Sequence, residues 1–405
     1  MNLNLNLNLI DRNLKSRFKQ SSLSVAVRNS IFILGLAHVN AQAATITVDT
    51  HLDNGDGCTL REAIVSANTS TNRNNGCAVG SDAGVDTITF SNSLISNTIT
   101  LSNGQLSVGN RKNIEINASM VSGGITLDAN NASRVLSVNS ASLLLDNLSL
   151  TRGRGSLNGG GVLANNSTVT LNNCTIARNT VTGFSVTRGG GIHMTESTFS
   201  VNNSLIANNS ANIGGGVLAR LGSTLTLNNS TISRNSALAN LASAIESYGT
   251  IVTFNNSTIE GNSGRTSNVA IDIDTFLGVG RLTLNNSIIA DSARENCRGS
   301  ATENAIVDAA TIVEDGGCGA QRSGDPGLLP LANNGGMTLT HGLAPDSIAI
   351  NTGDVSSCLN TDQRGFGRDS TCDVGAFEFN GIEPETQTST FIIPLSNGKT
   401  VIFEL

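Results

Sequence analysis

The sequence predicts an all-β fold, a right-handed parallel β-helix (a solenoid) with a short N-terminal capping helix. Two observations predict it. Six similar segments start 26 to 30 residues apart, a spacing typical of solenoids in which each repeat forms one coil. Within a segment, apolar residues alternate with polar ones, as in a half-buried strand. The segments are Leu143–Leu150, Val169–Ile176, Phe199–Ile206, Leu225–Ile232, Val252–Ile259 and Leu282–Ile289.

Stacking the coils in register predicts two interior columns of apolar side chains, with a rise of about 4.8 Å per coil. The first column comprises Leu145, Leu171, Val201, Leu227, Phe254 and Leu284, and the second comprises Leu150, Ile176, Ile206, Ile232, Ile259 and Ile289. A polar turn, usually Asn-Asn, separates the two columns, and Asn tolerates the left-handed backbone angles of such a turn. We expect the stacked Asn side chains to form hydrogen-bond ladders.

The first 43 residues differ from the rest of the chain. Five basic residues precede the apolar run Ile31–Ala37, and Ala41–Ala43 follows it. Basic, then apolar, then A-x-A is the order of a secretory signal, which predicts export and cleavage between Ala43 and Ala44. A disordered N-terminus is the alternative. Cleavage would leave a net charge of about −11, which argues against nucleic acid or an anionic membrane as partner. No later stretch of 18 apolar residues predicts a transmembrane helix.

The remaining chain divides by composition into further parts. An N-terminal cap is expected over 44–85, where Thr59 and Glu62 form a capping box at the start of a short amphipathic helix. Repeats occupy 86–300, a distinct C-terminal region 301–380, a polar linker 381–390 and a β-hairpin tail 391–405. We expect a single β-helix from about Thr87 to about Ile350.

Glycine triplets lie between the repeat segments, at 159–161, 189–191 and 214–216. No triplet is followed by Lys-Ser or Lys-Thr, so a phosphate-binding loop is disfavoured. The triplets instead predict a corner with unusual turn angles and close packing.

Six of the seven cysteines form three local pairs outside the most regular repeats. Export favours disulfides within these pairs, and the absence of short C-x-x-C spacings disfavours a metal site. The expected disulfides are Cys58–Cys77, Cys297–Cys318 and Cys358–Cys372. The seventh cysteine, Cys174, shares a column with serines and is expected to be free and buried; a reactive nucleophile is the alternative.

Motifs near both ends resemble known sequences. The segment Cys58–Ala63 (CTLREA) resembles the CSLREA motif of secreted bacterial β-helix proteins. Three later segments are similar to the choice-of-anchor Q domain, with Met337 where proline is usual; they are Asp325–Leu343, Thr361–Gly365 and Cys372–Glu378. The repeats also resemble, more loosely, those of polymorphic outer-membrane proteins. The resemblance implies a secreted or surface β-helix, and it carries no assigned reaction. The tail is either a sorting signal or a hairpin that packs on the scaffold.

An enzyme on this fold would need acidic residues together with a base or a metal ion. The best candidates are Asp272 and Asp274, two apart on a predicted strand and so on one face, with no evident basic partner in the adjacent coils. His193 follows a glycine triplet and is expected to point outward as an exposed turn residue, while His341 should make a structural hydrogen bond. Asp53–Gly57 could hold Ca²⁺, but it lacks the full EF-hand pattern, which favours a flexible acidic turn.

With one Tyr and no Trp, the chain lacks the flat aromatic surfaces on which sugar-cleaving enzymes usually seat their substrates. The sequence therefore favours a non-catalytic secreted or cell-surface scaffold that needs no cofactor and contacts a surface, a matrix or a glycan. A polysaccharide lyase or hydrolase on the same fold is the alternative. The oligomeric state and the means of attachment stay open.

Overall fold

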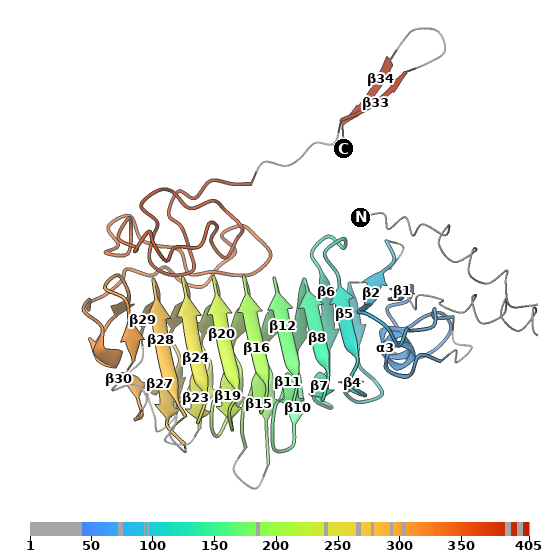
Figure 1. Ribbon diagram of the computed structural model, residues 1–405, viewed down its shortest axis with the longest axis horizontal. Helices are drawn as coiled ribbons and strands as arrows, with labels where there is room; N and C mark the ends of the chain where they lie inside the picture. The colour runs from blue at the N-terminus through green and yellow to red at the C-terminus, as the bar shows by residue number, and fades with distance from the viewer. Residues whose placement is uncertain are drawn as a thin grey trace, which may run out of the picture. The chain divides into compact units, whose positions relative to one another are not determined.

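The computed structural model describes residues 43–404, apart from the segments 72–75, 93, 95–96, 184–186, 239–241, 265–268, 277–278, 292–294, 301–304, 385–389 and 395–399. Residues 1–42 of the predicted signal segment thus lie outside the described residues, as do residues 395–399 of the predicted hairpin tail. The chain folds as the parallel β-helix that the sequence predicts, and its strands stack side by side in Figure 1. Three long sheets and one short sheet run along the solenoid.

The first long sheet, sheet A, contains ten strands within the described residues. They are β1 (Thr45–Val48), β2 (Asp86–Phe90), β5 (Asn113–Asn117), β8 (Ser142–Asp146), β12 (Thr168–Asn172), β16 (Thr198–Asn202), β20 (Thr224–Asn228), β24 (Ile251–Asn255), β28 (Arg281–Asn285) and β31 (Ile306–Val307).

Sheet B follows sheet A in each coil across the Asn turn. Its described strands are β3 (Thr98–Thr100), β6 (Ile125–Asp128), β9 (Leu148–Thr151), β13 (Thr175–Ala177), β17 (Leu205–Ala207), β21 (Thr231–Ser233), β25 (Thr258–Glu260), β29 (Ile288–Ala290) and β32 (Ile312–Val313).

Sheet C precedes sheet A in each coil. Its described strands are β4 (Leu106–Val108), β7 (Leu136–Asn139), β11 (Val162–Asn165), β15 (Ile192–Thr195), β19 (Val217–Arg220), β23 (Ile245–Tyr248), β27 (Val269–Asp274) and β30 (Glu295–Arg298). The short sheet D lies between B and C in the chain, with strands β10 (Arg154–Gly155), β14 (Thr180–Val181), β18 (Ser210–Ala211), β22 (Ser236–Ala237) and β26 (Ser263–Gly264).

Both predicted interior columns are confirmed by the strand register. Leu171 pairs with Leu145 on one side and Val201 on the other, and the same column continues through Phe254 to Leu284. The Ile176 and Ile232 column is likewise continuous in sheet B. All twelve side chains are buried, so these columns form the core that holds successive coils together.

Two asparagine ladders run along the solenoid, and only one was predicted. In the predicted ladder, at the end of the sheet A strands, each amide donates to the preceding coil, as from Asn202 Nδ2 to Asn172 Oδ1 at 2.9 Å. The second ladder lies inside the corner after sheet B and consists of Asn179, Asn209, Asn235 and Asn262. Its members are buried, and each amide also binds a backbone carbonyl of the preceding coil.

The glycine triplets pack against one another at the corner before sheet C, as predicted. Gly189 has φ +65°, and a Cβ atom on Gly190 would lie 2.4 Å from the carbonyl oxygen of Gly215. Only glycine permits this approach of backbones in adjacent coils.

The N-terminal end is closed by helix α3 (Leu60–Thr69), which has the predicted capping box of Thr59 and Glu62. The coils begin earlier than expected, because β1 within the predicted cap already pairs in parallel with β2. The prediction of a flexible acidic turn at Asp53–Gly57 is wrong for Asp53, which is buried and whose carboxylate accepts hydrogen bonds from Arg61 and from two backbone N–H groups; Asp56 is exposed.

The coils also end earlier than the expected Ile350, since the last long-sheet strand is β32, followed by the short 3-10 helix η2 (Gly317–Gly319). Residues 326–382 instead lie along the outer face of sheet B. Thr231 donates to Gln363 at 2.6 Å, and Thr258 accepts from the backbone N–H of Ala376 at 3.0 Å. His341 makes the expected structural contact, with its Nε2 2.8 Å from Glu260 Oε2.

Residues of the choice-of-anchor Q-like segments, together with Arg368 between them, hold this C-terminal region together. Arg368 forms a buried ion pair with Glu378 at 2.9 Å, and Arg364 pairs with Asp362 while stacking on Phe377. The charged groups of these side chains are paired with one another inside the region, so they form a structural network rather than an open binding site.

All three predicted disulfides are present, Cys58–Cys77, Cys297–Cys318 and Cys358–Cys372, and Cys174 is free and buried. In the tail, β33 (Thr390–Pro394) pairs antiparallel with β34 (Thr400–Glu404), which confirms the hairpin. No helix among the described residues is long and apolar enough to cross a membrane.

Candidate functional site

The outer face of sheet C carries three of the ionisable residues that the sequence singled out, namely His193, Asp272 and Asp274. Strand register places one outward residue per coil in a single row: Leu163, His193, Leu218, Glu246, Asp272 and Arg298. The row changes from apolar to charged toward the C-terminal coils, where the glycine triplet is replaced by Ser243-Ala244 and then Ala270.

His193 is buried rather than exposed, which corrects the prediction from the sequence. Its position on β15 is outward, yet only 4% of its surface is accessible, because the glycine corner folds over it. A Cβ atom on Gly189 would lie 2.9 Å from the His193 Cβ. Burial, reinforced by nearby arginines, lowers the pKa of His193 to about 4, so the imidazole is neutral at physiological pH.

Glu246 lies one coil before Asp272 and is 1% exposed. Its carboxyl group accepts hydrogen bonds from the Tyr248 hydroxyl at 2.5 Å and from the backbone N–H of Ala242 at 2.7 Å. Burial raises the pKa of Glu246 to about 7. Burial also raises the pKa of Tyr248, and the hydrogen bond to Glu246 adds to that shift.

Asp272 has a basic partner, contrary to the expectation that the adjacent coils offer none. Arg298 occupies the matching position of the next coil and donates from Nε to Asp272 Oδ2 at 2.7 Å. Burial raises the pKa of Asp272, and the arginine opposes the shift. The other oxygen, Oδ1, is buried without a hydrogen-bond partner among the described residues. Asp274, on the same face, accepts from the Ser300 backbone N–H at 3.0 Å.

Two carboxyl groups in adjacent coils, one with a pKa near neutrality, could in principle exchange protons with a substrate. Glu246 and Asp272 are both almost completely buried, so neither is open to solvent. The hydrogen bond between Glu246 and Ala242 stabilises the corner before β23, and the ion pair between Asp272 and Arg298 links two adjacent coils.

Sheet A presents a different surface. Between β12 and β24 its outward residues are uncharged and mostly hydroxyl- or amide-bearing, and they are half-buried or exposed. One column contains Thr168, Thr198 and Thr224, the next contains Thr170, Ser200, Thr226 and Thr253, and the third is the Asn172 to Asn285 ladder. Among the described residues, the hydrogen bonds of the C-terminal region to the solenoid go to sheet B and to the turns, and none goes to these outward side chains.

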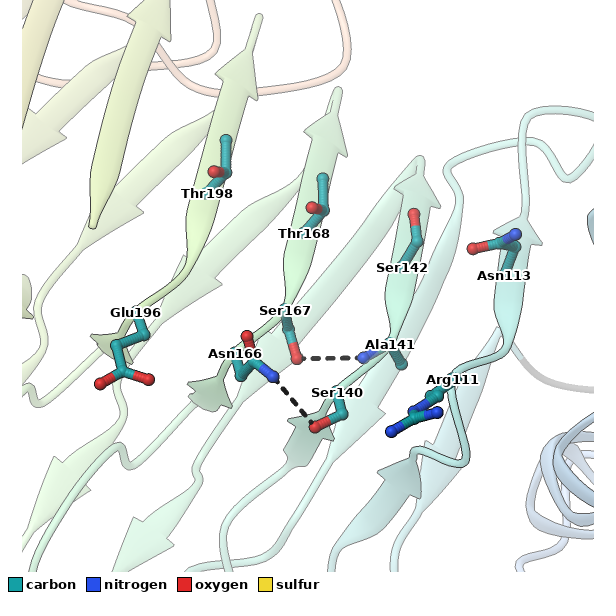
Figure 2. Close-up of a pocket in the computed structure, with 10 residues that line it drawn as sticks. All are labelled: Arg111, Asn113, Ser140, Ala141, Ser142, Asn166, Ser167, Thr168, Glu196 and Thr198. Carbon is teal, nitrogen blue, oxygen red and sulfur yellow. Dashed lines mark hydrogen bonds between the residues drawn. The ribbon is translucent and has the colours of Figure 1, made fainter. Parts of the chain in front are cut away.

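A hollow of about 340 Å³ lies where sheet C turns into sheet A (Figure 2). Arg111, Ser140, Asn166 and Glu196 hold equivalent places, each two residues before a sheet A strand, and each has a positive φ between 47° and 59°. Asn166 Nδ2 donates to Ser140 Oγ at 3.5 Å, so the middle of the row is neutral and polar. The sequence did not reveal this hollow, because corner residues follow no in-out alternation.

No protein-family model matches the sequence. No curated protein matches it either. Among solved structures the chain is similar to a crystal structure of pectate lyase Pel9A, with 15% sequence identity and a TM-score of 0.41 over 84% of this chain and 98% of that chain.

Proposed function

We propose that this protein is an exported β-helix scaffold that binds a neutral, hydroxyl-rich polymer, a polysaccharide surface, through the outer face of sheet A. The observation that carries the proposal is the uncharged array of Thr, Ser and Asn side chains that continues over β12, β16, β20 and β24. Three disulfides favour an oxidising compartment, in agreement with the predicted signal segment and with the resemblance to secreted β-helix proteins.

Because aromatic residues are scarce, such binding would depend on many weak hydrogen bonds. Without an aromatic platform, a single sugar gains only hydrogen bonds that compete with water, so each contact is weak. Coils repeat the same hydroxyl and amide groups about every 4.8 Å, and a long polymer contacts many of them at once. Weak contacts then combine through effective concentration, which favours adhesion to an extended surface over tight capture of a free sugar.

Co-sedimentation of the exported protein with insoluble neutral polysaccharides tests this proposal. A triple variant with Ser200→Glu, Thr226→Glu and Thr253→Glu places three charges in the middle column of sheet A. We expect it to lose at least tenfold in bound fraction at equal polymer concentration. Ser149→Glu, on the outer face of sheet B, is the control and should bind as the parent does. Equal binding by the triple variant and the parent would refute the proposal.

A second candidate function is acid–base cleavage of a polysaccharide, the alternative that the sequence left open. The ion pair between Asp272 and Arg298 favours it, because it supplies the basic partner that the carboxylates otherwise lacked. The assay is turnover on a panel of neutral and acidic polysaccharides, with and without Ca²⁺. We expect none; turnover that disappears in a folded Asp272→Asn variant would establish the enzyme.

A further inference from the structure

The hollow in Figure 2 carries two opposite charges that have no ionic partner within the described chain. Arg111 and Glu196 are both exposed, and no ion pair or side-chain hydrogen bond joins either of them to a described residue. Figure 2 shows them at opposite ends of the row, with Ser140 and Asn166 between. By contrast, Arg152 elsewhere in the solenoid is neutralised by Asp128 of the preceding coil.

Four successive coils each contribute one residue to the row that lines this hollow. The strands that follow the row, β5, β8, β12 and β16, pair in unbroken register. The two charged positions are therefore three coil rises apart, about 14 Å. One coil rise is roughly the length of one sugar residue in an extended glycan. A glycan lying parallel to the solenoid axis would thus place one sugar against each coil.

The two charges would determine which end of such a glycan lies at which end of the hollow. A guanidinium favours a carboxylate at its end of the hollow, whereas Glu196 repels a carboxylate at the other end. The floor between them offers hydroxyl and amide groups, with the Ser167 hydroxyl buried beneath and accepting from the backbone N–H of Ala141 at 3.3 Å. Neutral sugars suit that floor, and a chain with a carboxylate on every sugar does not.

We propose that this hollow binds a stretch of about four sugars along the solenoid axis, with a single uronate carboxylate on Arg111 and neutral sugars toward Glu196. The inference rests on the proposed function, since it names the glycan class that one edge of the sheet A surface selects. The site would anchor and orient a mostly neutral polysaccharide that bears occasional uronate groups.

Ligand-observed NMR titration of the exported protein tests the site with three probes of equal length. They are a xylo-oligosaccharide carrying one glucuronate, neutral xylotetraose, and tetragalacturonate. We expect the singly charged probe to bind best. Arg111→Gln should weaken its binding about fivefold, to the level of xylotetraose. Arg281→Gln removes an exposed arginine from the same sheet outside the hollow, and it should change nothing.

Two more variants separate the possible failures. Glu196→Gln should raise the affinity for tetragalacturonate about threefold, because it removes one repulsion. Thr168→Tyr, checked for folding by circular dichroism, should fill the hollow and abolish binding of all three probes. Equal affinities for the probes, unchanged by Arg111→Gln, would overturn this inference while polysaccharide co-sedimentation still supported the proposed function. Equal co-sedimentation of the sheet A triple variant and the parent would overturn the proposed function itself.

Discussion

Asn209→Ala tests how far the buried asparagine ladder stabilises the solenoid. Asn209 is 1% exposed, and its side chain forms four hydrogen bonds. The amide nitrogen donates to the Ile176 carbonyl at 2.9 Å and to Asn235 Oδ1 at 3.0 Å. The amide oxygen accepts from the Asn179 backbone N–H at 2.9 Å and from the Asn179 side chain at 3.0 Å.

The expected loss follows from what the neighbours retain after the substitution. Asn235 Oδ1 still accepts from the backbone N–H of residue 209, and Asn179 Nδ2 still donates to the Leu150 carbonyl. The backbone N–H of Asn179 loses its acceptor, Asn209 Oδ1, and lies too deep for water to take the place of that acceptor. At about 1 kcal/mol for each of the four hydrogen bonds and about 1 to 3 kcal/mol more for the unpaired donor, the free energy of unfolding should fall by about 5 to 7 kcal/mol.

Asn202→Ala, in the same coil, is the matched control. Asn202 also stands in a ladder, but it is half-buried, and it makes two side-chain ladder bonds, to Asn172 and from Asn228. Water can replace both, so we expect a loss of about 1 kcal/mol. Urea unfolding followed by circular dichroism, with all disulfides intact, measures both variants. Equal losses for Asn202→Ala and Asn209→Ala would refute the distinction between the two ladders.

Three other predictions follow from buried groups. Ile232→Asp should destabilise by more than about 4 kcal/mol, because it buries an unpaired charge, whereas Thr226→Asp on the outer face should cost about 0.5 kcal/mol; similar melting temperatures would contradict the inward assignment. Burial raises the pKa of Cys174 to about 12, so alkylation should require denaturant, and rapid labelling of the native protein would contradict this. Folded Glu246 keeps its proton up to about pH 7, while the unfolded chain loses it near its ordinary pKa. Its contribution to stability is therefore full below that lower pKa and is lost as the pH rises through 7, and Glu246→Gln should flatten the melting temperature over this window.

The sequence was sufficient to predict the interior of the solenoid. Alternation in each repeat identifies the inward side chains, and alignment of the repeats fixes which of them stack, so the Leu171 and Ile176 columns required no knowledge of the loops. The ladder of Asn172 and Asn202 followed for the same reason. Asn179 and Asn209 were missed because a single Asn at a corner, outside the alternating segment, is equally compatible with a solvent-exposed turn.

The outer faces were predicted less well, because an outward position can still be covered. His193 occupies an outward-facing position in the alternation of its strand, but the glycine corner covers it. Arg298 stands at the matching position to Asp272, yet its segment departs from the repeat, so the register between them could not be read from the sequence. The placement of residues 326–382 along sheet B depends on long-range contacts such as that between Thr231 and Gln363, for which no local pattern exists.

The chemistry of the three outer faces differs in a way that folding alone does not require. Sheet C and the C-terminal region pair their charges in buried contacts, which link coils and corners. The outward residues of sheet A make few such contacts, so charged side chains there would cost little stability, as Glu115, Asp146 and Arg281 toward its ends illustrate. A surface constrained only by solubility would carry charges throughout. The proposed binding of a neutral polymer would account for the uncharged stretch from β12 to β24. Glu196 lies at the edge of that stretch, two residues before β16, and Arg111 lies two coils outside it, two residues before β5, so a polymer that follows the solenoid axis past Glu196 and Arg111 would leave the uncharged face there.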